Sequence, residues 1–314
     1  MKVKDGFIFG AATSSYQIEG GRSAGNRADC IWDDFCDSKK VANGHNADIA
    51  CDHYNRYEED IDLLLNLGVS HYRMSVAWGR IFPAPGKFNR EGMDFYVRLL
   101  TALKAKNIKA CVTLYHWDMP KWLQDMGGWE VRDNIGHFLQ YAEACFKYLD
   151  PLADMWITHN EPWCASILSN YLGRHAPAKT DLSAALKVGH NILLSHGMTV
   201  KLYREKSGFK KIGITVNLNP VHPKTESASD RLAAANFDGN FNRWFLDALF
   251  KGAYPSDMTA FYKGLIGDFS FVRDGDFGII GEPCDFLGIN YYQCSMAEYD
   301  ADAELLFREV WGAW

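Results

Sequence analysis

The sequence predicts an α/β fold, a (β/α)8 TIM barrel of which about six of the eight β/α units lie in these 314 residues. Short β-rich runs alternate with longer amphipathic stretches, which favours a parallel sheet covered by helices. Polar residues follow several of these runs, and a barrel carries its active site at the carboxyl ends of its strands. A barrel uses about 250 residues as one domain, so residues 1–314 are expected to form a single domain.

Six short runs rich in apolar and β-branched residues are the predicted strands. They cover residues 7–12, 69–78, 108–116, 155–159, 212–217 and 286–292. Too few residues follow the sixth run for two more strand–helix units. The sequence therefore predicts an incomplete barrel.

Helical patterns separate the runs. Residues 54–67 place Tyr57, Ile61 and Leu64 on one face, and Gly68 then fits a helix C-cap. The same spacing of apolar residues recurs over 93–106, 135–149 and 184–203. Each helix is expected to cover the sheet with its apolar face.

A doubly wound open sheet is the alternative architecture. It usually carries a Gly-rich phosphate turn after its first strand, and the Gly20–Gly21 pair does not follow that pattern. In a barrel, polar residues at strand ends meet at one mouth, whereas in an open sheet they spread along an edge. The residues in question are Gln17, His116, Asn160, Glu161, Asn290 and Tyr292.

Composition excludes several classes of partner. The chain is 47% hydrophobic with a net charge of -6, so we expect no nucleic-acid partner. No apolar run reaches about 18 residues, and the charged N-terminus has no apolar signal segment, so neither a membrane span nor a signal peptide is expected. The eight cysteines form no Cys-x-x-Cys pair, which favours reduced thiols in a cytoplasmic protein and no metal site.

The strongest chemical signal is residues 156–162, WITHNEP. An apolar strand ends in Asn160 and Glu161, and Pro162 cannot continue the ladder. A carboxyl group at this point, walled by aromatic residues, is partly desolvated, and desolvation favours the protonated acid. Such a group suits general acid catalysis. The alternative is a structural glutamate paired with Arg73.

This segment resembles the Asn-Glu-Pro signature of glycoside hydrolase family one, the β-glucosidase family. Four more segments resemble the family's strands in the family's order, and together they cover the whole chain. They are residues 7–20 (FIFGAATSSYQIEG), 72–81 (YRMSVAWGRI), 113–120 (TLYHWDMP) and 287–292 (LGINYY).

The resemblance implies a retaining β-glycosidase, and a β-glucosidase is the expected activity, acting on a small β-glycoside without metal or cofactor. It implies that Glu161 is the acid/base and that Asn160 holds the sugar 2-hydroxyl. Gln17 and His116 would bind hydroxyls on the far side of the ring, and Trp117 would shape the pocket. Without the resemblance, His116 is read as a satisfied core histidine and Gln17 as a loop cap.

The resemblance also implies residues that support a second carboxylate, the nucleophile. Arg73 would lie beside it and keep it ionised, and Tyr292 would hydrogen-bond it, with Asn290 next to Tyr292. The family's nucleophile motif, Thr-Glu-Asn-Gly, does not occur in this sequence. Residues 310–314 instead resemble the approach to the family's strand seven, so a C-terminal truncation is expected.

Three consequences are expected of such a truncated barrel. The chain alone should hydrolyse β-glucosides weakly or not at all, because retaining glycosidases need two carboxyl groups. The unpaired strand edges should lead to self-association or to a second chain that completes the barrel. The alternative functions are a non-catalytic sugar-binding fragment and, with less support, a phosphate-sugar isomerase.

Overall fold

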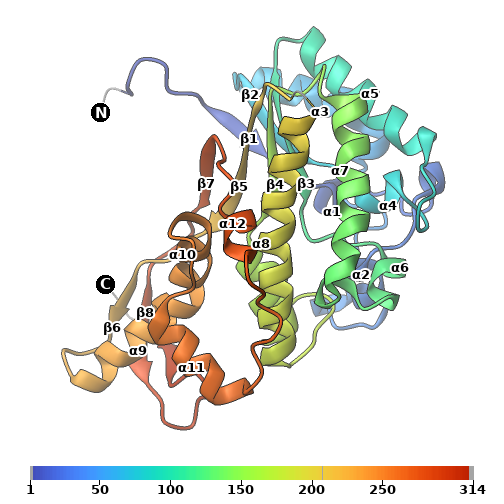
Figure 1. Cartoon of the computed structure of the whole chain (residues 1–314). Coiled ribbons are helices and arrows are strands. Elements are labelled where there is room, and N and C mark those ends of the chain that lie inside the picture. The colour runs from blue at the N-terminus through green and yellow to red at the C-terminus, as the bar shows by residue number, and fades with distance from the viewer. Residues whose placement is uncertain (1–2, 207, 311–314) are drawn as a thin grey trace.

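The computed structural model describes residues 3–206 and 208–310. Its main sheet has six parallel strands in the order β1-β2-β3-β4-β5-β7 (Figure 1). The strands are β1 (Gly10–Ala12), β2 (His71–Ser75), β3 (Lys109–Tyr115), β4 (Met155–Asn160), β5 (Lys211–Asn217) and β7 (Phe286–Asn290). All six predicted strands are present, which confirms the prediction of an incomplete parallel barrel.

The first strand is shorter than predicted. Residues 7–12 were expected to form it, but only Gly10–Ala12 pair with β2. The side chains of Phe7, Ile8 and Phe9 are 62%, 56% and 59% exposed. In the described part of the chain β1 has a neighbour on one side only, so these apolar residues have little to pack against.

The four predicted helices are confirmed within three residues at each end. They are α3 (His53–Asn66), α5 (Arg90–Ala105), α7 (Ile135–Leu149) and α8 (Leu182–Glu205). The Asp181 side chain caps α8 by accepting a hydrogen bond from the Ala184 amide at 3.0 Å. Helices α7 and α8 run side by side against the outer face of the sheet (Figure 1). No helix in residues 3–206 or 208–310 has the length and apolarity needed to span a membrane.

Shorter helices occupy the connections. Those that follow the first three strands are α1 (Ser15–Ile18) and α2 (Ile31–Asp37) after β1, α4 (Trp78–Ile81) after β2 and α6 (Lys121–Asp125) after β3. Two one-turn π-helices, η5 (Cys164–Leu168) and η6 (Gly239–Arg243), follow β4 and precede α10. The later helices are α9 (Ala228–Asp238), α10 (Trp244–Phe250), α11 (Ser256–Ile266) and α12 (Asp276–Ile280).

A second, three-stranded sheet was not predicted. It consists of β6 (Val221–Pro223), β8 (Ser295–Tyr299) and β9 (Phe307–Val310), and β8 pairs with β6 in parallel and with β9 antiparallel. Helix α9 packs on it around a small apolar cluster that includes Phe237 and Ala297. This unit lies beside the carboxyl-end region of the main sheet at the lower left of Figure 1. Residues 311–314, most of the segment that resembles the approach to strand seven, lie outside the described residues.

The large core lies between the main sheet and its helices. Trp78, Trp156 and Trp244 are at most 1% exposed and are part of this core. Glu19 is also buried and accepts hydrogen bonds from Arg80 at 2.8 Å and from Tyr96 at 2.7 Å. Glu19 therefore braces the loop that follows β1.

Candidate active site

A hydrogen-bonded network joins the ends of β4 and β7 to the middle of β2 in the main sheet. Asn160 and Asn290 are the last residues of β4 and β7, and Arg73 lies in β2. The Asn160 Oδ1 atom accepts hydrogen bonds from the Arg73 guanidinium and, at 3.1 Å, from Asn290 Nδ2. Arg73 Nε also donates to Thr113 Oγ1 at 3.2 Å. The parallel register brings these side chains together because all the strands end on the same side.

The network fixes the tautomer of His116. A guanidinium can only donate, so the atom of Asn160 that faces Arg73 is the amide oxygen. The Asn160 amide nitrogen therefore donates to His116 Nε2, at 3.3 Å. Burial and the Arg73 charge lower the pKa of His116 to about 3, so the ring is neutral at pH 7 and carries its proton on Nδ1. That buried N–H has no partner among the described residues and can donate to a ligand hydroxyl.

Glu161 is buried at the end of β4, with 2% of the residue exposed. One carboxylate oxygen accepts hydrogen bonds from Asn290 Nδ2 and, at 3.1 Å, from the Tyr292 hydroxyl. The other accepts from the Cys164 thiol at 3.1 Å. Arg73 bonds to Asn160 and not to Glu161, so the alternative of a structural Glu161–Arg73 ion pair is wrong.

The backbone is strained at two of the predicted site residues. Trp117 has φ 74° and Glu161 has φ 52°, a region that side chains other than Asn and Asp rarely adopt. The β4–β5 register also shifts between Ile157 and Asn160, and the Glu161 amide then bonds to the Thr215 carbonyl at 2.7 Å. Strain and bulges of this kind concentrate at functional sites, where they aim a side chain.

Two cavities meet at Trp117. One, of about 350 Å³, is lined by Gln17, His116 and Trp117. The other, of about 850 Å³, is lined by Trp117, Glu161 and Tyr292. The Trp117 indole N–H donates to the Asn160 carbonyl at 2.8 Å, which ties the wall between the cavities to the network. All eight predicted site residues therefore belong to one region, seven through hydrogen bonds and Gln17 through the cavity lining.

Burial also lowers the pKa of Arg73. Among the described residues, its hydrogen-bond partners are two amide oxygens and a hydroxyl, none of which carries a charge. A half-buried guanidinium with neutral partners favours an anion nearby. Glu161 is one such anion, and its charge acts against the lowering of the Arg73 pKa. That Arg73 also lies beside a second carboxylate stays a prediction.

Two residues of the site were missed by the sequence analysis. Cys164 donates to Glu161, and Asn217 at the end of β5 donates to the Cys164 sulfur at 3.6 Å. The Asn217 Oδ1 atom is buried without a partner in the described part of the chain. Asn217 ends a predicted strand, as Asn160 does, so its position was a usable signal. Cys164 carries no such signal, because a buried cysteine is more often a packing residue.

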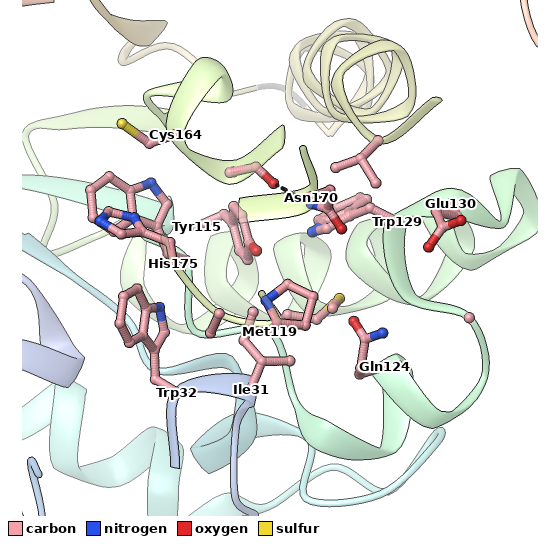
Figure 2. Close-up of a pocket in the computed structure, with 16 residues that line it drawn as sticks. Ile31, Trp32, Tyr115, Met119, Gln124, Trp129, Glu130, Cys164, Asn170 and His175 are labelled. Carbon is pink, nitrogen blue, oxygen red and sulfur yellow. Dashed lines mark hydrogen bonds between the residues drawn. The ribbon is translucent and has the colours of Figure 1, made fainter. Parts of the chain in front are cut away.

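A third cavity lies deeper among the loops and is too small for a sugar. Its volume is about 20 Å³, roughly the space of a single water molecule. Figure 2 shows Cys164 and His175 towards one end of it and Gln124 and Glu130 towards the other. The substrate-sized space at the strand ends is therefore the pair of cavities that share Trp117 in their lining.

The fold and the site define a class of protein. A buried carboxyl group, two amides and a neutral histidine lie at the carboxyl ends of a barrel-type parallel sheet, where barrel enzymes carry their active sites. The chain belongs to glycosyl hydrolase family 1, whose family model matches residues 1–309.

Individual relatives agree with this assignment. Beta-glucosidase A of Acetivibrio thermocellus is 44% identical over 300 residues, which are 95% of this chain and 67% of that protein. The solved beta-glucosidase of Exiguobacterium antarcticum B7 is 49% identical with a TM-score of 0.98, over 100% of this chain and 71% of that one. The Thermotoga maritima beta-glucosidase, solved in complex with castanospermine, is 36% identical with a TM-score of 0.92, over 99% and 70%. The chain thus spans about two thirds of the length of these relatives.

Proposed function

We propose that the chain carries the sugar-binding and acid/base part of a retaining β-glucosidase that acts by double displacement. The observation that supports this is the placement of Glu161, buried at a strand end beside a cavity of about 850 Å³. There it would protonate the leaving oxygen of the glycoside and later remove a proton from the attacking water.

The neighbouring residues would hold the sugar. The Asn160 amide would contact the 2-hydroxyl, since it is adjacent to Glu161 and is itself held by Arg73. His116 Nδ1–H would donate to a hydroxyl, and Gln17, which lines the same cavity, would bind a second one. Trp117 would form the wall between the two cavities.

The second carboxylate would come from outside these 314 residues. In a retaining enzyme it lies about 5–5.5 Å from the acid/base. We propose that Arg73, Asn290 and Tyr292 support it there, since Arg73 has uncharged partners and Tyr292 already bonds to the Glu161 carboxylate. The 314-residue chain alone is then expected to bind sugars but to hydrolyse them weakly.

The open edges of the main sheet would be covered by further strands. β1 and β7 stand at its two ends, and Ile289, Tyr291 and Tyr292 on the β7 side are 55%, 61% and 75% exposed. We propose that a second copy or a completing segment pairs with them. Sedimentation velocity of the 314-residue chain should show association that increases with concentration; a single monomer species at every concentration would contradict this.

A cytoplasmic location is also proposed. All eight cysteines are free thiols in the structure, and half-buried or buried thiols without disulfide partners are typical of reducing compartments.

Two assays on the purified 314-residue chain test the proposed function. Castanospermine should bind, since the residues proposed to hold the sugar are all present. Hydrolysis of an aryl β-glucoside should be at least about a thousandfold slower than with the Exiguobacterium relative assayed in parallel, because one of two catalytic carboxylates is lacking. Turnover within tenfold of that relative, or no binding of castanospermine, would contradict the proposal.

A matched variant separates this function from a non-catalytic sugar-binding fragment, the alternative that the missing Thr-Glu-Asn-Gly motif favours. In a complex that restores turnover, such as the chain mixed with the C-terminal third of the Exiguobacterium relative, Glu161→Gln should abolish hydrolysis. Glu143→Gln, a change on the surface of α7, should leave it unchanged. Equal activity of both variants would remove Glu161 from the mechanism.

A further inference from the structure

Helix α1, which carries Gln17, is too short to be stable by itself. It has four residues, Ser15–Ile18, and the side chain of Ser14 before it makes no capping hydrogen bond. A single helical turn fixes several residues for one hydrogen bond, so contacts with other parts of the chain have to hold it in place. The position of Gln17 therefore depends on those contacts.

The first residue of α1 is held by two polar side chains from other strand ends. Ser15 is buried, and its backbone amide donates to the Ser75 hydroxyl at the end of β2 at 2.7 Å. The Ser75 hydroxyl in turn donates to the Ser15 hydroxyl at 3.1 Å. The Ser15 hydroxyl then donates to Asp118 Oδ2, also at 3.1 Å.

Asp118 belongs to the loop that carries the other sugar-binding side chains proposed at this cavity. It follows His116 by two residues and Trp117 by one. The bond from Ser15 to Asp118 therefore joins the helix of Gln17 directly to the loop of His116. Both partners are buried, so water competes little for this bond and the two segments are held at a fixed separation.

Stability alone does not explain a carboxyl group at position 118. Asp118 is 2% exposed, and its Oδ1 atom has no partner in the described part of the chain. The cavity beside it, which Ser15 and Arg27 also line, has about 10 Å³, roughly the space of one water molecule. Burial of a carboxyl group with a neutral hydroxyl as its partner costs free energy of folding. A positioning role accounts for a group that is costly to bury.

We propose that Asp118 and Ser15 are positioning residues, which set Gln17 against His116 so that both reach hydroxyl groups of the same sugar. The inference rests on the proposed function, in which Gln17 and His116 hold that ring. Both residues line the cavity of about 350 Å³, so a movement of α1 away from the loop would separate them. Groups that are already in place reduce the entropy cost of binding.

Calorimetric titration of the 314-residue chain with castanospermine tests the proposal in two backgrounds. Gln17 is exposed, so Gln17→Ala should fold and should weaken binding about tenfold. Ser15→Ala removes one hydroxyl group and should weaken binding about fivefold. Added to Gln17→Ala, it should have no further effect, because the side chain that it positions is gone. A structural role would weaken binding in both backgrounds, and that result would overturn the inference.

Conservative variants assign the effect to the hydrogen bond. Asp118→Asn keeps an oxygen that accepts from Ser15 and should bind castanospermine within about twofold of the parent, whereas Asp118→Ala should weaken binding as Ser15→Ala does. Ser23→Ala is the matched control and should leave the affinity unchanged, since Ser23 is exposed in the same connection and makes no side-chain capping bond. Equal affinities of Asp118→Asn and Asp118→Ala would overturn the assignment to this bond.

The same titrations separate the inference from the proposed function. If the parent chain does not bind castanospermine, or if Gln17→Ala binds it as the parent does, the proposed sugar site fails and the inference fails with it. If Gln17→Ala weakens binding and Ser15→Ala does not, only the positioning role of Ser15 and Asp118 is overturned.

Discussion

Asn160 is the residue on which the candidate site depends most. Its oxygen accepts from Arg73 and Asn290, its nitrogen donates to His116, and its carbonyl accepts from the Trp117 indole. These contacts satisfy most of its hydrogen-bonding capacity and fix the orientation of the amide. At the proposed site a sugar hydroxyl would meet an amide and a histidine that are already oriented, which would reduce the entropy cost of binding.

Replacement of Asn160 by alanine should weaken castanospermine binding about tenfold to a hundredfold. The change removes a direct contact and also leaves Arg73 and His116 without a shared partner. Asn55→Ala on the exposed face of α3 is the control and should leave the affinity unchanged. Calorimetric titration of both variants measures the effect, and an unchanged affinity in Asn160→Ala would show that the amide does not hold the ligand.

Residue-scale prediction from the sequence succeeded where a polar residue follows an apolar run. Asn160, Glu161 and Asn290 were identified this way because parallel strands end on the same side of the sheet. The hydrogen bond from Cys164 to Glu161 was not predictable, since it depends on a π-helical turn directly after the strained Glu161 backbone. Local sequence pattern does not report such a turn.

Helix α8 illustrates how closely the elements approach one another. Gly197 lies where α8 meets α12, and a Cβ atom there would come within 1.8 Å of the Ile279 carbonyl oxygen. The glycine is required by this contact and not by its own backbone conformation. The 3.6-residue period predicted the helix, but no period in the sequence indicates that α12 crosses at residue 197.

Gly197→Ala should lower the free energy of unfolding by about 2 kcal/mol or more, because backbone atoms of α12 cannot move aside as a flexible side chain would. Gly136→Ala in α7 is the matched control. An added Cβ there meets no atom within 4 Å, so this variant should be as stable as the parent or more stable by up to about 1 kcal/mol. Urea unfolding measures both, and equal stabilities would contradict the close approach of α8 and α12.

The small sheet shows the limit of prediction at the scale of elements. Its strands have three to five residues and join segments far apart in the sequence. Residues 221–223 of β6, for example, pair with residues 295–297 of β8. Strands this short give little alternation to detect. The long helices were predicted because each carries a strong local period, and the six barrel strands because each is a run of apolar and β-branched residues.

The whole molecule buries several neutral histidines. Burial lowers the pKa of His196 to about 3 and that of His175 to about 4. Burial and the Arg73 charge together lower the pKa of His116 to about 3. In the unfolded chain these groups titrate near 6.5. Below pH 6.5 the unfolded state therefore binds more protons than the folded state, so stability falls as the pH falls. Burial raises the pKa of Asp118 to about 7, which acts in the opposite direction below pH 7.

The net effect is a loss of stability between pH 6.5 and pH 5. Each histidine lowers the free energy of unfolding by at most about 1.4 kcal/mol per pH unit as the pH falls. The opposite effect of Asp118 cancels the contribution of about one of the three histidines. Urea unfolding at pH 7.0, 6.0 and 5.0 should show a free energy of unfolding that decreases towards pH 5. Asp118→Asn should make the decrease steeper, and a stability that is constant over this range would show that the histidines are not buried as neutral rings.

The proposed function requires Glu161, Asn160 and His116 to reach the same bound sugar, next to Trp117, which lines both cavities. A crystal structure of the 314-residue chain with castanospermine tests it most directly. Hydroxyl groups of the ligand are expected within hydrogen-bond distance of His116 Nδ1 and the Asn160 amide, with the ring beside the Glu161 carboxyl group. A ligand bound elsewhere, with the His116 N–H still unpaired, would contradict the proposed site.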